Sequence, residues 1–358
     1  MEPFEAGGRL IVSGREIVSC RLQVFSKIHD GYILDLMTMP DVVGEEPFHE
    51  GELALQDRVG VKEKVARFGR RGILRFMPDE HREFFEQLPF VFVASLDESG
   101  HPWASMVWGV PGFAASPDPA TLHVAGRVAP GDPLSRNLAA GAPVGILGIE
   151  LETRRRNRLN GVVTARDGDA FALHVTQSFG NCQKYIQVRR AKFARDPSAP
   201  VPTKVTEEGS RLSPTASDIV ASTDTFFIAS RSARPELGGH GEGVDVSHRG
   251  GLPGFAHQDH AGESTVITFP DYVGNFLFNT LGNIHVDPRV GLLFVDFARG
   301  ALLTLIGSAE IVWDGPLVQA VEGAERLIRV TIRSGFRFDD VLPFTWSAPS
   351  FAPQFSRA

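Results

Sequence analysis

The chain has 358 residues, of which 42% are apolar and 22% charged, and its formal net charge is −7. These values are ordinary for a globular protein, so they exclude general disorder, and the length suggests roughly two domains. The acidic balance argues against broad binding to nucleic acid or anionic membranes, although a local basic patch could hold a phosphate. Two cysteines, Cys20 and Cys182, cannot form a disulfide framework or a multi-cysteine metal site.

No apolar run reaches the ~18 residues of a membrane helix. The acidic N-terminus is unlike a signal peptide. We therefore expect a cytoplasmic protein without a membrane partner.

The sequence predicts three parts in chain order. Residues 1–45 resemble nothing else in the chain and are expected to form an N-terminal extension. A first domain is expected over residues 46–200 and a second over residues 201–358. The Pro-, Ala- and Ser-rich stretch Asp196–Pro214 is typical of a linker between them.

Both domains follow one plan. Each begins with a short helix, predicted over Pro78–Leu88 and Pro214–Ser222, because proline followed by small or acidic residues is a helix-start pattern. Six short runs rich in Val, Phe, Ile and Thr follow in each domain, bounded by Gly, Pro and Asp turns, and one short helix interrupts each set. We predict a mainly β fold with short helices, built as two closed or nearly closed antiparallel barrels.

The two domains also resemble each other residue by residue. Phe90–Ser95 resembles Phe226–Ser230, and the segment beginning at Asn137 resembles the one beginning at Asn283. The offset between matching residues only grows, from 135 at Ala94 to 146 at Asn137, and it grows where loops are expected. This order and spacing indicate two copies of one domain.

Familiar catalytic and metal motifs are missing from the sequence. It contains no G-x-S-x-G, H-E-x-x-H, C-x-x-C or Walker motif. The histidines at 240, 248, 257 and 260 fit no common metal-ligand spacing, so we expect no metal site. Cys182 has no neighbouring base in sequence and is expected to be a buried structural thiol.

Polar residues gather instead at strand ends in the second domain. The strand Val244–Gly250 places Ser247 and Arg249 on one face and His248 on the other. Asp271 and Tyr272 end the next strand. A helix is then expected to carry a polar set at its start or along one side: Gly274, Asn275, Asn279, Thr280 and Asn283. Such a helix N-terminus with a nearby arginine suits a phosphate and a polar heterocycle. The alternative is that Asp271 and Asn275 only cap the helix.

The first domain keeps the serine of this set but lacks the histidine and the arginine. At an offset of 142, Ser247, His248 and Arg249 align with Ser105, Met106 and Val107. This asymmetry favours the second domain as the carrier of the principal site.

Two segments of the first domain are also polar. The arginine run 154–158 is more typical of a solvated edge that blocks sheet pairing than of a second anion site. Residues Thr176–Arg190 are expected to turn at Gly180-Asn181 into a helix that reaches over the second domain.

Seven segments together resemble the pyridoxamine 5′-phosphate oxidase-like, FMN-binding split-barrel family, in particular its tandem bacterial branch. They are Phe48–Val61, Phe76–Ser95, Arg154–Gly161, Gln177–Gln187, Asp245–Phe255, Phe269–Ile284 and Pro288–Phe297. The resemblance implies a six-stranded split barrel in each half. It also implies FMN held without a covalent link at the seam between two barrels, either within one chain or within a homodimer.

The resemblance further implies a set of cofactor-binding residues. They are Gln177, Ser178, Asn181, Ser247, His248, Arg249, Phe269, Pro270, Asp271, Tyr272, Asn275 and Asn279. The family's basic phosphate-binding pair is replaced by Gly274-Asn275, so the phosphate charge is expected to rest on Arg249 and the helix N-terminus. No residues match the oxidase's substrate-phosphate site, which argues against vitamin B6 oxidation.

The resemblance implies an FMN-dependent oxidoreductase acting on an unidentified small molecule, with NAD(P)H or an electron-transfer protein as candidate partner. The sequence indicates no particular catalytic residue, because in flavin chemistry the cofactor itself carries the electrons. The alternative is a non-catalytic flavin or haem carrier or sensor, and a deazaflavin-dependent reductase on the same fold is a third hypothesis.

Overall fold

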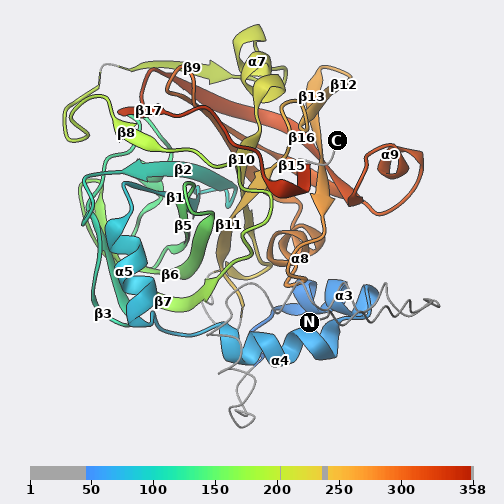
Figure 1. Ribbon diagram of the computed structural model, residues 1–358, viewed down its shortest axis with the longest axis horizontal. Helices are drawn as coiled ribbons and strands as arrows, with labels where there is room; N and C mark the ends of the chain where they lie inside the picture. The colour runs from blue at the N-terminus through green and yellow to red at the C-terminus, as the bar shows by residue number, and fades with distance from the viewer. Residues whose placement is uncertain (1–45, 202, 236–240, 356–358) are drawn as a thin grey trace, which may run out of the picture. The chain divides into compact units, whose positions relative to one another are not determined.

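Two antiparallel sheets with the same strand order build the part of the chain that the computed structural model describes, residues 46–201, 203–235 and 241–355 (Figure 1). The expected extension 1–45 lies outside the described residues. The first sheet has the order β2-β1-β5-β6-β7-β4-β3 and the second the order β11-β10-β14-β15-β16-β13-β12. The predicted mainly β fold is confirmed.

The strands of the first sheet are β1 (Phe90–Leu96), β2 (Pro102–Trp108), β3 (Ala114–Asp118), β4 (Thr121–Val124), β5 (Pro143–Glu150), β6 (Arg155–Asp167) and β7 (Ala170–Gly180). Those of the second are β10 (Thr225–Arg231), β11 (Val244–Gly250), β12 (His257–Ala261), β13 (Ser264–Tyr272), β14 (Arg289–Asp296), β15 (Ala301–Val312) and β16 (Ala324–Asp339). Strand β9 (Lys204–Glu208) pairs with β16 and makes the second sheet eight-stranded, whereas the first has seven strands. Six strands were predicted in each half, and the additional strands of these two sheets are β3, β12 and β9.

The described residues also form short helices. They are α3 (Glu50–Arg58), α4 (Lys62–Gly72), α5 (Asp79–Gln87), α6 (Leu134–Asn137), α7 (Pro214–Ser222), α8 (Asn279–Val286) and α9 (Pro316–Gln319), with a 3-10 turn, η2 (Pro353–Phe355). The predicted lead-in helices α5 and α7 are confirmed. None of the described helices is both long and apolar enough to cross a membrane.

Three predictions about local structure are wrong. Part of the expected linker is strand β9 (Lys204–Glu208), which pairs with β16, while β8 (Ala191–Phe193) pairs with β17 (Phe344–Trp346). Residues 181–190 form no helix. Helix α8 begins at Asn279 rather than at Gly274, because Phe276 and Phe278 both take left-handed backbone conformations just before it.

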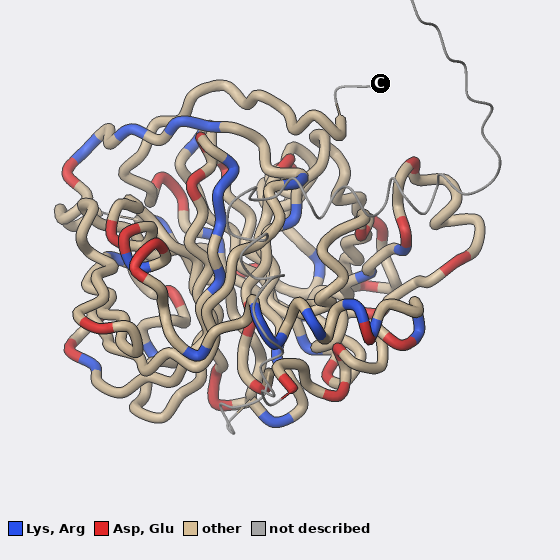
Figure 2. Tube along the Cα trace, turned by 60° about the horizontal axis from the view of Figure 1, so that its bottom comes forward, with Lys and Arg blue, Asp and Glu red and all other residues tan. Residues whose placement is uncertain are grey.

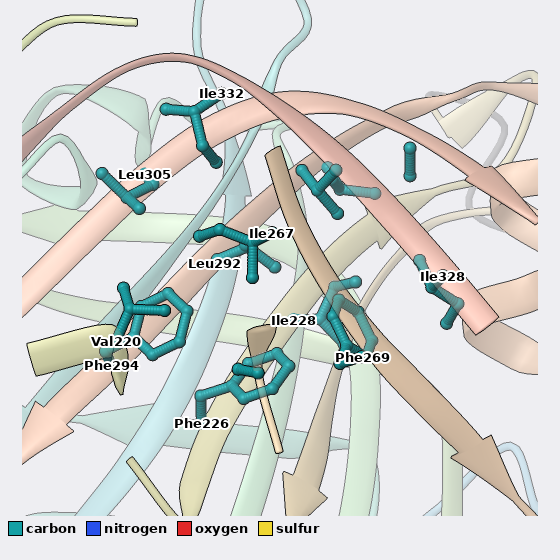
Figure 3. Close-up of a cluster of buried hydrophobic side chains, with 14 of the residues drawn as sticks. Val220, Phe226, Ile228, Ile267, Phe269, Leu292, Phe294, Leu305, Ile328 and Ile332 are labelled. Atoms are coloured by element: carbon teal, nitrogen blue, oxygen red, sulfur yellow. The ribbon is translucent and has the colours of Figure 1, made fainter. Parts of the chain in front are cut away.

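Each sheet has its own apolar core, and a third core joins the two. Figure 3 shows the core of the second half, where side chains from β10, β13, β14, β15 and β16 meet α7. Phe269 lies fully buried in this core. The joining core contains side chains of both sheets, and its Phe92 and Phe227 rings stack with centroids 3.4 Å apart.

The boundary where the two halves meet through this joining core is called the seam below. The contacts across the seam are reciprocal. A Cβ on Gly145 of β5 would lie 2.2 Å from the Val244 carbonyl oxygen at the start of β11. A Cβ on Gly291, the matching residue of β14, would lie 2.4 Å from the Pro102 carbonyl oxygen at the start of β2. Exchanging the two halves thus exchanges the contacts, as an approximate two-fold axis between them requires.

Within each half the same hydrogen bond anchors the internal helix. Asn137 Nδ2 donates to Ser95 Oγ in the first half, and Asn283 Nδ2 donates to Ser230 Oγ in the second, both at 3.0 Å. The two halves are therefore alike in side-chain bonding as well as in strand order.

The close approach at the seam predicts the effect of a single methyl group. Gly145→Ala forces a Cβ against a backbone oxygen that cannot turn away, so we expect a loss of about 1–3 kcal/mol in unfolding free energy, measured by urea denaturation. Gly209→Ala is the control, because no atom lies within 4 Å of its added Cβ. Equal stability of the two variants would contradict the close approach of Gly145 to the Val244 carbonyl oxygen.

Candidate functional site

One pocket opens on the seam and is lined from both halves. The first half contributes β6 and the segment after β7, and the second contributes β11, the end of β13, the loop that follows, and the first turn of α8. The lining residues are Arg156, Arg158, Asn181, Cys182, Lys184, Tyr185, Ser247, His248, Arg249, Gly250, Pro270, Asp271, Tyr272, Val273, Gly274, Asn275, Phe276, Phe278, Asn279, Thr280, Leu281 and Arg326. Basic and acidic residues are interspersed over the described trace (Figure 2), whereas this lining holds five cations and one carboxylate.

A buried ion pair fixes the floor of the pocket across the seam. Arg158 is 3% exposed, and its Nη1 lies 3.2 Å from Asp245 Oδ1 while its Nη2 donates to Ser247 Oγ. Asp245 also accepts from Asn160 Nδ2 at 2.9 Å and from Asn283 Nδ2 at 3.0 Å. Asp245 therefore neutralises Arg158 and ties β6, β11 and α8 together.

A second carboxylate serves two further arginines. Arg249 Nη1 lies 2.5 Å from Asp271 Oδ1, and Arg326 Nε lies 3.6 Å from Asp271 Oδ2. Arg326 also contacts Glu325 at 3.7 Å. Asp271 thus shares its charge between two cations instead of capping a helix.

Arg156 has no such compensation. Its Nε donates to the Cys182 carbonyl oxygen at 2.6 Å, and no carboxylate of the described residues pairs with it. Burial, together with the neighbouring Arg158 and Arg249, lowers its pKa to about 10. Arg156 therefore remains charged at neutral pH and gives the pocket a net attraction for anions.

Several donors in the pocket have no partner among the described residues. They are Asn181 Nδ2, Arg158 Nε, Arg249 Nε and Arg326 Nη1. A buried donor without a partner costs free energy, so these atoms favour a ligand rich in acceptor oxygens. A phosphate ester fits this donor set.

Two stacked tyrosines form an aromatic part of the pocket lining. Tyr185 and Tyr272 stack with ring centroids 5.1 Å apart, and Tyr185 Oη donates to the Val273 carbonyl oxygen at 2.9 Å. Burial raises the pKa of both phenols, so both stay neutral. Burial, with Arg156 and Arg249 nearby, lowers the His248 pKa well below its usual value, so its imidazole is neutral as well.

Nine of the twelve residues expected to bind a cofactor line this pocket: Asn181, Ser247, His248, Arg249, Pro270, Asp271, Tyr272, Asn275 and Asn279. The other three lie elsewhere. Gln177 donates to the Pro47 carbonyl oxygen, Ser178 is fully buried 2.8 Å from His81 Nδ1, and Phe269 belongs to the core.

The prediction of a solvated edge at the arginine run is wrong. Strand β6 is interior, because it lies between β5 and β7. Its alternate residues Arg156 and Arg158 share one face of the strand and line the pocket. Asn275 lies in the loop before α8, where its Oδ1 accepts from the Leu277 amide at 3.2 Å. The expectation of a buried Cys182 is confirmed.

Sequence reasoning missed Lys184, Tyr185 and Arg326 as lining residues. Lys184 and Tyr185 lie in the segment noted as unusual, but that segment was expected to be helical. Arg326 stands in an ordinary alternating strand, which carries no sign of a site.

The related seam on the other side of the two-fold axis is apolar. The positions of Arg156, Arg158 and Asp245 are taken there by Leu302, Thr304 and Trp103. Leu302 is fully buried, Thr304 Oγ1 donates to the Ala104 carbonyl oxygen, and Trp103 packs on Phe336. Only one of the two related seams therefore carries this cationic lining.

The Arg158–Asp245 pair predicts a strong coupling. Arg158→Met leaves Asp245 buried without its counter-ion, so we expect a loss of about 3–5 kcal/mol in unfolding free energy. Adding Asp245→Asn removes the stranded charge and should recover most of that loss in urea denaturation. A double variant no more stable than the single one would show that the two charges do not compensate each other.

Asp132 near the apolar seam predicts a pH dependence. It accepts from Ser105 Oγ at 2.5 Å and from the Leu134 amide at 2.8 Å, and its burial raises the pKa from 3.8 to about 6. The folded protein therefore binds this proton more tightly, so its stabilisation is complete below pH 3.8 and is lost as pH rises through about 6.

Asp132→Asn keeps both acceptor bonds and removes the charge. We expect it to remove about 3 kcal/mol of the change in unfolding free energy between pH 4 and pH 7. An unchanged pH profile in the variant would exclude this role for Asp132.

Comparisons with known proteins agree with the fold. Residues 77–199 match the family model described as pyridoxamine 5′-phosphate oxidase, which covers α5, the whole first sheet and β8. No curated protein matches the chain.

Several solved structures resemble parts of the chain. A putative pyridoxamine 5′-phosphate oxidase from Lactobacillus delbrueckii has 13% identity and a TM-score of 0.27, covering 36% of this chain and 93% of its own. The heme-storage protein HutZ from Vibrio cholerae has 14% identity and a TM-score of 0.25, covering 37% and 97%. A FAD-binding protein from Mesorhizobium loti has 9% identity and a TM-score of 0.24, covering 38% and 99%. The family-model match makes residues 77–199, which hold the first of the two sheets, similar to the pyridoxamine 5′-phosphate oxidase family.

Proposed function

We propose that this chain binds one FMN in the seam pocket without a covalent link and acts as an FMN-dependent oxidoreductase on a small molecule. The observation that carries the proposal is the uncompensated charge of Arg156 among buried donors that have no partner. A phosphate monoester supplies the charge and acceptor oxygens that this end of the pocket lacks. The apolar character of the related seam supports one cofactor per chain rather than two.

The side chains have distinct tasks in this proposal. Arg156 and Arg249 bind the phosphate from the two sides of the seam, while the Arg158–Asp245 pair holds Ser247 and α8 in place. The Tyr185–Tyr272 pair offers a flat apolar wall for a ring system. Bound FMN supplies the electron transfer, and the residues bind it, orient it and exclude water.

A titration with FMN tests the proposal. We expect saturation at one FMN per chain, followed by flavin fluorescence and by calorimetry. Arg156→Met and Arg249→Met should each weaken binding by about 1.5–3 kcal/mol, the usual loss for a hydrogen bond to a charged group.

The matched control is Arg155→Met. Arg155 neighbours Arg156 on β6 but pairs with Glu80 Oε1 at 2.8 Å outside the pocket. Its removal should leave FMN affinity unchanged. Absence of FMN binding by the parent protein, or an equal loss in Arg155→Met, would contradict the proposed site.

One observation favours the alternative of a non-catalytic flavin or haem carrier. Among the described lining residues, His248 and both tyrosines have pKa values displaced away from neutrality, so none is suited to proton transfer near pH 7. A neutral imidazole with an unpartnered Nε2 is also a ligand that haem iron accepts. Turnover of NAD(P)H with oxygen or a dye by the FMN-loaded protein supports the oxidoreductase, and tight binding without turnover supports the carrier.

A further inference from the structure

Segment 181–190, called the wall below, lines the pocket through Asn181, Cys182, Lys184 and Tyr185. It has no helix or strand of its own, so other segments must hold it. The side chain of Gln187 is fully buried and is bonded at both ends. Its Nε2 donates to the Gly251 carbonyl oxygen at 2.8 Å, and its Oε1 accepts from the Ala352 amide at 2.7 Å. Gln187 thus links the wall to β11 on one side and to the C-terminal segment on the other.

The C-terminal segment runs alongside the wall as a paired strand would. Val188 and Ser350 exchange two backbone hydrogen bonds of 2.9 and 3.0 Å, and the Ser347 amide donates to the Arg190 carbonyl oxygen at 3.0 Å. Arg154 adds a bond from the β5–β6 turn, since its Nε donates to the Ile186 carbonyl oxygen at 2.9 Å. Residues 347–352 therefore supply backbone partners that the wall would otherwise lack.

The same segment ends on the aromatic pair. The Phe355 ring centroid lies 5.8 Å from that of Tyr185 and 5.7 Å from that of Tyr272. Tyr185 has a left-handed backbone with φ of 67°, and its carbonyl oxygen lies so close to Gly250 that a Cβ there would come within 2.0 Å. A bulky residue in this conformation costs free energy and persists only where its surroundings hold it.

We propose that residues Ser347–Phe355 form a strap that sets the position of the pocket wall, with Phe355 as the positioning residue for the Tyr185–Tyr272 pair. No residue of the strap lines the pocket, so the strap can act on a bound ligand only by positioning the wall. Its effect on FMN rests on the proposed function, whereas its effect on the tyrosines does not.

Fluorine NMR tests the placement without any ligand. The chain has three tyrosines, so 3-fluorotyrosine labelling gives three resonances, assigned by Tyr185→Phe and Tyr272→Phe variants. Phe355→Ala should shift both the Tyr185 and the Tyr272 resonances, and Phe355→Leu should restore most of their positions. The matched control is Phe351→Ala in the same segment, because that ring is 36% exposed. Unmoved resonances in Phe355→Ala, or equal shifts in Phe351→Ala, would overturn the proposal.

Hydrogen exchange tests the backbone part of the strap. A chain ending at Ala348 should lose protection at the Val188 amide by at least about tenfold while the central strands β1 and β10 keep theirs. If that chain fails to fold, Ser350→Pro is the second variant, because it removes the amide that donates to Val188. Retained protection of the 185–190 backbone in either folded variant would overturn the strap.

The affinity for FMN separates the two proposals. If the parent binds FMN, Phe355→Ala should weaken it by about tenfold at unchanged stoichiometry, and unchanged affinity would overturn the positioning role. If the parent binds no FMN, the proposed function fails, and the fluorine and exchange results still decide whether the strap positions the wall.

Discussion

The buried Arg158–Asp245 pair is the interaction on which the seam pocket depends. Removing both charges from water is costly, and the pair is tolerated because Asp245 accepts two further hydrogen bonds and Arg158 donates to Ser247. These bonds connect β6 of one half to β11 and α8 of the other. Every other lining residue is placed relative to strands that this network joins, so the pair fixes where the surrounding cations stand.

The two halves show how one architecture yields one cationic pocket. Strand order, the glycine contacts at the seam and the helix-anchoring Asn–Ser bonds are the same in both halves. The side chains that differ are those facing the two related seams. Arg158 and Asp245 of the polar seam correspond to Thr304 and Trp103 of the other seam. Because these two residues carry no charge, their burial needs no network of ion pairs and hydrogen bonds. The apolar seam thus contributes packing, while the polar one replaces part of that packing with buried charges and their hydrogen bonds.

Strands with apolar alternation and helices with clear start patterns were predictable from the sequence, as α5, α7 and most strands show. Strands β3 and β12 were not, because both are short and neither has a continuous buried face to produce an apolar alternation. The arginine run was assigned to the wrong environment because the pattern predicts which residues share a face but not which strand is interior. The start of α8 depends on left-handed Phe276 and Phe278, a conformation that no sequence pattern predicts for bulky residues.

Burial and charge in the pocket also explain why its histidine and its two tyrosines are neutral near pH 7. His248 is buried and feels the charges of Arg156 and Arg249, and both effects disfavour the imidazolium. The same burial keeps Tyr185 and Tyr272 protonated. Burial, joined at His248 by the neighbouring guanidinium groups, therefore moves the pKa values of these side chains away from neutrality. A group whose chemistry resides in its own ring system is suited to such a pocket, because it needs orientation and charge complementarity from the protein more than proton transfer.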